Sequence, residues 1–152
     1  MHSRICIQTD DFDMAEEYQQ LRQQQSEVGA VVCFVGLVRE LENDASIDKL
    51  TLEHYPGMTE QLLQAIIDEA GSRWALSAAT VIHRVGELLP SDQIVLVAVA
   101  SQHRADAFEA AQFIMDYLKT KATLWKKIDQ RGRQYWVQDK ASDRQAAERW
   151  KK

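Results

Sequence analysis

Apolar residues in the first half of the chain fall into short runs that predict β-strands, separated by segments with helical spacing. Strands are expected where apolar positions alternate with polar ones or form a brief continuous run, at residues 4–9, 29–38 and 48–55. Helices are expected over 13–25, which are rich in Glu and Gln, and over 58–74, whose leucines and isoleucines recur at helical spacing. Both kinds of element are therefore mixed from the start.

The second half continues this mixture around one long helix, expected over 104–121 with Ser101 as its cap. Its apolar stripe is formed by residues three or four positions apart: Phe108, Ala111, Met115, Leu118 and Ala122. A last helix is expected over 142–150. Two pairs of strands, each joined by a turn (at 89–92 and at Gly132), are expected at 79–85, 93–100, 125–128 and 134–137. Because several neighbouring strands are close enough to form hairpins, the chain is assigned to the α+β class.

The length of 152 residues suits one core and is too short for two, so a single domain over 1–152 is expected. The longest apolar runs, 30–35 and 94–100, fall far short of the roughly 20 residues that cross a bilayer. The N-terminus lacks the long apolar stretch of a secretory signal. We therefore expect a cytoplasmic protein with no membrane association, in which Cys6 and Cys33 are free core residues.

The formal net charge is −5, from 18 basic and 23 acidic residues, which argues against a nucleic-acid partner. An anionic ligand would need a local basic pocket. The basic residues that can form one are concentrated in the last third of the chain: His103, Arg104, Lys119, Lys121, Lys126, Lys127, Arg131 and Arg133. The composition thus favours a small anionic ligand over a large one.

Two places along the long helix can carry chemistry. At its start, His103 and Arg104 next to unpaired backbone N–H groups can seat a phosphate, or can simply be surface residues. Near its end, Lys119 borders the apolar stripe and can act as a base or nucleophile, or can merely complement the helix dipole. Strand alternation sends Lys126 and Lys127 to opposite faces, so at most one of them faces a given pocket.

No short sequence motif in the chain identifies a particular reaction. The chain has no phosphate-binding loop, no nucleophile elbow and no zinc-protease helix. His54 and His83 lie within alternating strands without a second ligand at suitable spacing, so core or hydrogen-bonded roles are favoured and no metal is expected.

Seven segments nevertheless occur in a recognisable order between Gly29 and Trp150: GAVVCFVGLVR (29–39), LEHYPGM (52–58), HRVGEL (83–88), SQHR (101–104), FEA (108–110), MDYLK (115–119) and WKK (125–127). Together they resemble the large, catalytic subunit of molybdopterin synthase, the MoaE family. The resemblance covers nearly the whole chain.

This resemblance implies an α/β-hammerhead fold with an additional small antiparallel sheet, and a homodimer at the centre of a heterotetramer. It implies a small ubiquitin-like partner whose C-terminal Gly-Gly tail carries a thiocarboxylate, and cyclic pyranopterin monophosphate as substrate. The implied activity is that of a sulfurtransferase, which builds the molybdopterin dithiolene in two sulfur transfers. No cofactor is implied, and the absence of an obvious catalytic cysteine fits a sulfur atom that arrives on the partner.

The resemblance also assigns residues. Lys119 and Lys126 correspond to the catalytic lysines. The substrate-binding residues it implies are Val38, Arg39, His103, Arg104, Lys119, Lys126 and Lys127. Lysine ammonium groups can stabilise the oxyanion formed as the thiocarboxylate is consumed.

Helix geometry adds a condition to these assignments. Arg104 and Lys119 are fifteen positions apart, which is roughly 22 Å along one helix at about 1.5 Å per residue. A pterin monophosphate is too short to span that distance. If both groups touch one substrate, one of them must come from a second copy of the chain, so we expect a composite site at a homodimer interface.

Some positions depart from the family pattern. Ile128 stands where Glu is common, Thr123 where Pro is usual, and Ser91 where Gly is usual. Two other functions therefore remain open. One is a partner-binding homologue with the same fold and weakened catalysis, and the other is a lysine-dependent lyase that acts on a phosphorylated carbonyl compound.

Overall fold

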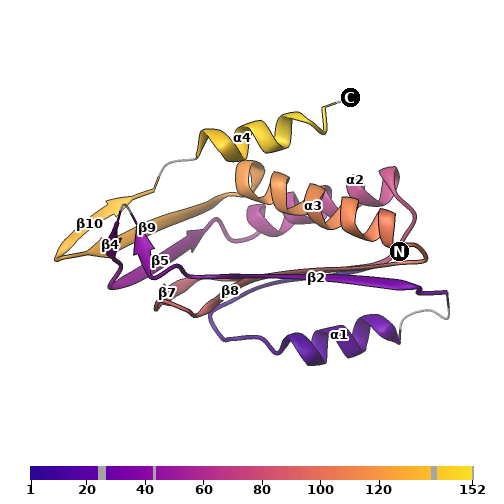
Figure 1. Ribbon diagram of the computed structural model, residues 1–152, viewed down its shortest axis with the longest axis horizontal. Coiled ribbons are helices and arrows are strands. Elements are labelled where there is room, and N and C mark those ends of the chain that lie inside the picture. The colour runs from indigo at the N-terminus through magenta and orange to yellow at the C-terminus, as the bar shows by residue number, and fades with distance from the viewer. Residues whose placement is uncertain (24–26, 43, 138–139, 152) are drawn as a thin grey trace.

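The computed structural model describes residues 1–23, 27–42, 44–137 and 140–151. Its main sheet has four strands in the order β1 (His2–Gln8), β6 (Leu76–Arg84), β8 (Gln93–Ser101) and β2 (Ala30–Leu37). β1 pairs with β6 in parallel, and the other neighbours are antiparallel. Figure 1 shows α1 (Met14–Arg22) against one face of this sheet and α2 (Met58–Arg73) with α3 (Arg104–Lys121) against the other.

A second, fully antiparallel sheet extends from one end of the first. Its strands are, in order, β10 (Arg133–Trp136), β9 (Leu124–Gln130), β5 (Lys49–His54) and β7 (Gly86–Leu88). A two-stranded ribbon, β3 (Leu41–Glu42) with β4 (Ala45–Ser46), lies beside it, and α4 (Ala141–Glu148) follows β10. The α+β class and the hammerhead arrangement with an additional antiparallel sheet are thus confirmed.

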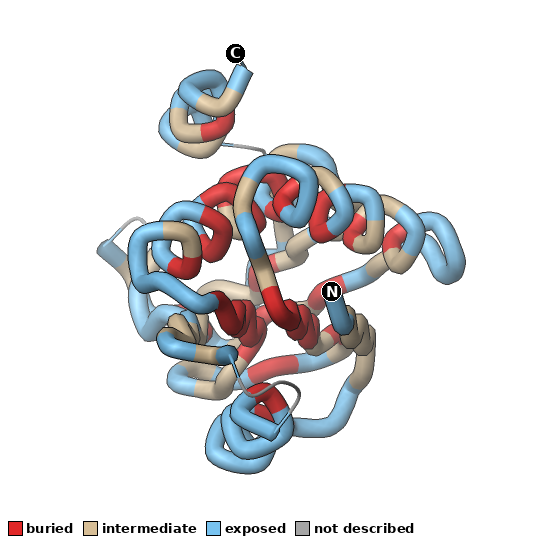
Figure 2. Tube along the Cα trace, turned by 90° about the vertical axis from the view of Figure 1, so that its right-hand side faces the viewer, coloured by how far each residue is buried: buried red, intermediate tan, exposed pale blue. Residues whose placement is uncertain are grey.

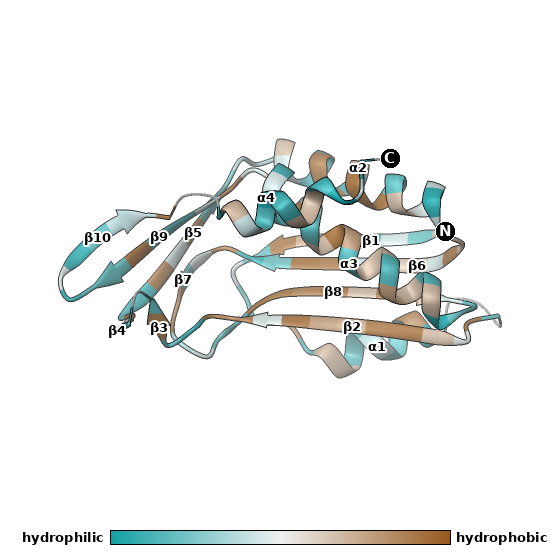
Figure 3. Cartoon of the chain, turned by 45° about the horizontal axis from the view of Figure 1, so that its top comes forward, coloured by the Kyte–Doolittle hydropathy of each residue, from teal (hydrophilic) through white to brown (hydrophobic). Residues whose placement is uncertain are grey.

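The main sheet is buried on both faces because its central strands are apolar without interruption. Side chains of β8 alternate between two core clusters, with Val95, Val97 and Val99 on the α2–α3 side and Leu96 and Ala98 on the α1 side. Figure 2 shows the buried segments gathered between the helices, and Figure 3 shows the apolar colour concentrated along the main sheet. Burial on both sides explains why these strands read as continuous apolar runs in the sequence.

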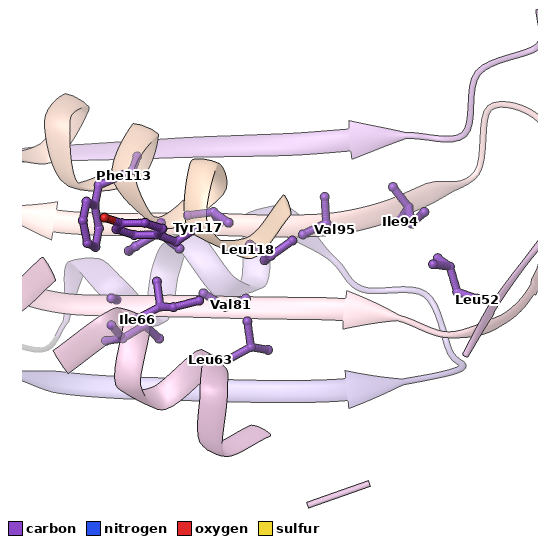
Figure 4. Packing of buried hydrophobic residues seen from close by; sticks show 14 of the residues in the cluster. Leu52, Leu63, Ile66, Val81, Ile94, Val95, Phe113, Tyr117 and Leu118 are labelled. Carbon is purple, nitrogen blue, oxygen red and sulfur yellow. The ribbon is translucent and has the colours of Figure 1, made fainter. Parts of the chain in front are cut away.

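Aromatic residues pack helix α3 into the core, and one buried carboxylate links it to the C-terminal segment. Phe113 and Tyr117 of α3 stand edge to face at 4.5 Å and point into the larger cluster (Figure 4). The carboxylate of Asp116, 6% exposed, accepts hydrogen bonds from the Trp150 indole at 2.7 Å and from Arg149 at 3.1 Å. The C-terminal segment is therefore tied to the last turns of α3, which fixes the end of the helix where Lys119 lies.

The structure corrects the expected packing of α3. Phe108, expected within the apolar stripe, is 62% exposed, and the buried face is formed instead by Ala107, Ala110, Ala111, Phe113, Ile114, Tyr117 and Leu118. Ser101 is not the cap, because His103 occupies that position. The Ser101 hydroxyl instead donates to the carbonyl of Ala75 at 2.7 Å and ends β8.

The other expected elements are confirmed within a few residues at each end. The first helix was expected to reach residue 25, and its predicted end at 24 and 25 lies outside the described residues. The short strands β3, β4 and β7 were not expected from the sequence. Among the described residues, no helix is long and apolar enough to cross a membrane.

Candidate active site

A cavity of about 390 Å³ lies where the two sheets meet the C-terminal end of α3. Its apolar wall includes Ile94 and Val95 of β8, Leu118 of α3 and Ile128 of β9. Its charged lining residues come from four different parts of the chain: Arg39, Glu42, Lys119, Lys126 and Lys140. Because four of these five are cationic, the cavity suits an anionic ligand of small-molecule size.

Two lysines face each other in this cavity. Lys119 is in the last turn of α3, and Lys126 is the third residue of β9. Burial lowers the pKa of Lys126 to about 8, and the charge of Lys119, a hydrogen bond with Lys119 and the charge of Lys140 act in the same direction. Lys126 can therefore change between ammonium and free amine near neutral pH, as a group that transfers protons must.

A smaller cavity of about 160 Å³ adjoins the first and shares the lysines. The residues common to both are His83, Leu118, Lys119, Lys126, Val137 and Lys140. The smaller cavity alone is lined by Leu52, Ala122, Leu124 and Asp143. The two spaces thus meet at Lys119 and Lys126, so that two different reactants can approach the same amines from two sides.

His83 lies beneath the lysines, 5% exposed, near the end of β6. Its Nδ1 is 2.8 Å from the carbonyl oxygen of Arg84, which can only accept, so Nδ1 carries the proton and Nε2 has a free lone pair. Burial, together with the charges of Lys119 and Lys126, lowers the pKa of His83 to about 4, although the hydrogen bond to Arg84 acts in the opposite direction. The imidazole is therefore neutral at neutral pH. The expected hydrogen-bonded role of this residue is confirmed.

The mouth of the larger cavity is built by the segment that follows β2. Val38 is 4% exposed, its N–H donates to the Asp92 carbonyl at 2.9 Å, and its carbonyl accepts from the Ser91 N–H at 2.8 Å. The next residue, Arg39, forms an ion pair with Glu42 at 2.7 Å. The buried Val38 thus fixes the backbone directly before Arg39, and the guanidinium of Arg39 at the rim can bind an anionic ligand.

The other two candidate residues are not brought to this cavity by the same chain. His103 and Arg104 are exposed at the N-terminal end of α3 and line neither cavity. α3 runs without interruption from Arg104 to Lys121, so the separation of roughly 22 Å between Arg104 and Lys119 is present. One chain therefore presents two groups of cations, one at each end of a single helix.

Lys127 also lies away from the cavities. Its ammonium is 5.7 Å from the centre of the Trp136 ring, on the opposite face of β9 from Lys126. The expectation that only one of these two lysines faces the pocket is confirmed, whereas the assignment of Lys127 to the same site has no support within one chain. The cysteines, both half-buried and free, line neither cavity either.

Three ionisable residues that line the larger cavity were missed as site residues by the sequence reasoning: Glu42, His83 and Lys140. His83 had been noted only as a strand histidine, and the other two stand in segments without periodicity. Only His83 falls within a segment that carries the resemblance, and no signal in the sequence selects the other two. Among the described residues, no group of three His, Cys, Asp or Glu side chains is placed to hold a metal ion.

The model of the MoaE protein family matches residues 7–121 of this chain. The molybdopterin synthase catalytic subunit of Escherichia coli K12 is 52% identical over 148 residues, which are 97% of this chain and 98% of the relative. The subunit of the same name from Vibrio cholerae is 51% identical over 99% of each chain.

Solved structures agree with these relatives. The molybdopterin biosynthesis MoaE protein of Burkholderia ambifaria superposes with a TM-score of 0.84 at 48% identity, covering 97% of both chains. The molybdopterin synthase of Staphylococcus aureus superposes with a TM-score of 0.80 at 31% identity, covering 89% of this chain and 96% of the other. The similarity in sequence and in three dimensions thus spans both sheets and the cavities between them.

Proposed function

The chain belongs to the MoaE protein family, and from that premise we propose that it is the catalytic subunit of a molybdopterin synthase. In this proposal it transfers sulfur from the thiocarboxylated C-terminus of a small ubiquitin-like partner to cyclic pyranopterin monophosphate, as one functional unit over its whole length. The observation that carries the proposal is the pair Lys119 and Lys126, which stand between two adjoining cavities with the pKa of Lys126 lowered to about 8.

The two cavities differ in a way that suits two reactants. The larger, at about 390 Å³, has the volume and the cationic lining for a phosphorylated pterin. The smaller, at about 160 Å³, suits an extended Gly-Gly tail, because glycine has no side chain to accommodate. A thiocarboxylate at the end of such a tail would then reach the lysine pair from the side opposite the pterin.

The sulfur atom must come from outside the chain in this reaction. Cys6 and Cys33 line neither cavity, and burial raises the pKa of the Cys33 thiol, which disfavours the nucleophilic thiolate. A partner that delivers sulfur on its own C-terminus removes the need for a cysteine nucleophile here.

Each transfer exchanges one oxygen for one sulfur. The thiocarboxylate sulfur forms a bond to a side-chain carbon of the pterin, and the oxygen on that carbon leaves as water. A second water then cleaves the acyl–sulfur bond, so that the tail departs as a carboxylate and the sulfur remains on the pterin. No electrons are gained or lost, and two tails supply the two sulfurs of the dithiolene.

The lysines have complementary roles in this scheme. Lys126 can supply a proton to the departing oxygen and then take one from the second water as it attacks the acyl carbon, because its pKa of about 8 lies close to the working pH. Lys119, as an ammonium group, can stabilise the oxyanion that forms when water attacks the acyl carbon. Arg39 at the rim and Val38 beneath it would hold the anionic substrate against the pair.

We further propose that His103 and Arg104 complete the site of a neighbouring copy in a homodimer, itself the centre of a heterotetramer with two small partners. The 18-residue length of α3 keeps these residues from the cavity of their own chain. Among the described strands, β2 is paired on one side only, and its Phe34 and Leu37 are 41% and 56% exposed. An unpaired edge with exposed apolar side chains supports contact with a second copy.

Reconstitution tests the proposed function. The chain should form molybdopterin when it is mixed with a thiocarboxylated small subunit and cyclic pyranopterin monophosphate, and the carboxylate form of that subunit should give no product. Binding of the small subunit without dithiolene formation would indicate the weakened homologue instead. Borohydride trapping of a substrate adduct on Lys119 without any small subunit would indicate the lyase.

A further inference from the structure

Glu42 is the one carboxylate among the described residues that line the larger cavity. Its side chain is 16% exposed, and its Oε2 accepts a hydrogen bond from Nη2 of Arg39 at 2.7 Å. The cations around it are Arg39, Lys119, Lys126 and Lys140. A half-buried carboxylate inside a cluster of four cations has a larger electrostatic effect than the same group on an open surface, because water screens it less.

The backbone fixes where this carboxylate stands. The side-chain amide of Gln130, at the end of β9, donates to the carbonyl of Glu42 at 2.7 Å and to that of Ala45 at 2.8 Å. These two bonds hold the β3–β4 ribbon against the strand that carries Lys126. Glu42 is therefore restrained twice, through its carbonyl by β9 and through its side chain by Arg39.

The strand beside it lacks a carboxylate of its own. Ile128 lies two residues after Lys126 on β9, so both side chains point to the same face, and both line the larger cavity. Ile128 is 3% exposed and packs in the apolar cluster. Nothing on this face of β9 offsets the charges of the two lysines, and the nearest described source of negative charge in the cavity is the ribbon.

We propose that Glu42 is the positioning carboxylate of this site, holding Arg39 at the cavity rim and supplying from β3 the negative charge that β9 lacks at Ile128. Its role in the reaction rests on the proposed function, whereas its effect on the lysines does not. Glu42 touches Arg39 and acts on the substrate through it, so it is not itself a catalytic residue.

The charge balance at Lys126 agrees with this role. The charge of Glu42 raises the pKa of Lys126, against the lowering by burial, by Lys119 and by Lys140. The other described groups with ionisable side chains that line the two cavities are Arg39, His83 and Asp143. Removing the Glu42 charge should therefore shift the titration of Lys126 to lower pH and leave Arg39 without its partner.

The first experiment is the titration of Lys126 in the full chain without substrate, followed by NMR of its labelled side chain. Glu42→Gln should lower the pKa of Lys126, whereas the matched control Glu40→Gln should leave it unchanged, because the exposed Glu40 lines neither cavity. An identical titration in Glu42→Gln and the parent chain would overturn the proposal. Because no substrate is present, this result stands whether or not the chain makes molybdopterin.

The second experiment moves the carboxylate. In the reconstituted synthase, Glu42→Gln should reduce kcat/KM for the pterin about 10-fold and displace the pH–rate profile to lower pH. Adding Ile128→Glu to that variant should restore both, since position 128 faces the same cavity. If the folded double variant restores neither, a carboxylate at position 128 does not replace that of Glu42, and the proposed role of Glu42 is wrong. If it does not fold, Glu42→Asp takes its place, and failure of this charge-conserving variant to keep the parent titration would equally overturn the role.

Discussion

The two ends of α3 carry cations in opposite settings. At the C-terminal end, Lys119 meets Lys126 between two cavities, above a buried neutral imidazole. At the N-terminal end, His103 and Arg104 are exposed and line neither cavity. The first end lines both cavities with cations, and the second carries two further cations that line no cavity in their own chain. The proposed homodimer accounts for this difference, because each chain would then supply one part of a shared active site from each end of α3.

The largest effect should come from the C-terminal end. Lys126→Gln should reduce dithiolene formation about 100- to 1,000-fold, about 3–4 kcal/mol, because it removes the amine that faces both reactants. Lys127→Gln makes the same chemical change one residue away, on the face with Trp136, and should reduce the rate by no more than about 2-fold. Equal losses in single-turnover assays of the two variants would mean that the cavity is not where the reaction occurs.

Acid should destabilise the fold through His83, which lines the cavities at the C-terminal end of α3. Its pKa is about 4 in the folded chain and 6.5 when unfolded, so between these values the unfolded state binds more protons. The contribution of His83 to the free energy of unfolding is therefore fully present above pH 6.5. It is lost as the pH falls towards 4, by about 3 kcal/mol. His83→Asn keeps a donor for the Arg84 carbonyl and should flatten the dependence in urea titrations at a series of pH values.

The matched control for this pH dependence is His103→Asn, at the other end of α3. That substitution removes an exposed imidazole at the N-cap of α3, where Asn is a preferred residue, so its stability curve should keep the shape of the parent curve with a constant upward offset. A parent chain whose stability does not change between pH 6.5 and 4 would contradict the buried, neutral state of His83.

The N-terminal end should affect binding more than turnover. Arg104→Gln should raise KM for the phosphorylated pterin about 10- to 30-fold, roughly 1.4–2 kcal/mol, because it removes a charge-assisted bond to phosphate. The same chain should keep its small-subunit affinity. Arg133→Gln, an exposed arginine on β10 outside the cavities that touch the lysines, should leave KM unchanged. An unaltered KM in Arg104→Gln would remove the reason to look for a second copy.

The smallest effect concerns the turn that supports the cavity mouth. Ser91 has a φ of 72°, a conformation that favours glycine, while its N–H holds the Val38 carbonyl at 2.8 Å. Ser91→Gly should raise the free energy of unfolding by about 0.5–1 kcal/mol without loss of activity. Ser46→Gly, in β4, should lower it instead. A thermal melt of both variants checks the sign, and destabilisation by Ser91→Gly would contradict the strain.

The sequence predicted the long elements because each buries a periodic apolar face. The bounds of α3 were predicted in full, yet Phe108 was placed inside, since helical spacing alone does not say which side a neighbouring sheet covers. β7 was missed because three residues, from Gly86 to Leu88, show no period. Lys119 and Lys126 could be named from the resemblance.

The surroundings of those lysines could not be predicted in the same way. His83 and Glu42 reach the cavity only through the pairing of distant strands and through the Gln130 contacts to the ribbon. Their contribution depends on burial and on the charges nearby, which appear only when the chain is folded. The sequence therefore identified the two main amines of the site, but it did not predict the electrostatic balance around them.

Whether the ends of α3 from two copies form one site can be measured by mixing Lys119→Ala chains with Arg104→Ala chains under conditions of confirmed subunit exchange. Each mixed dimer then holds one site with both substitutions and one site with neither, so an equal mixture should recover about a quarter of the parent activity. Activity that stays at the average of the two separate variants, although mixed dimers are present, would contradict the shared site.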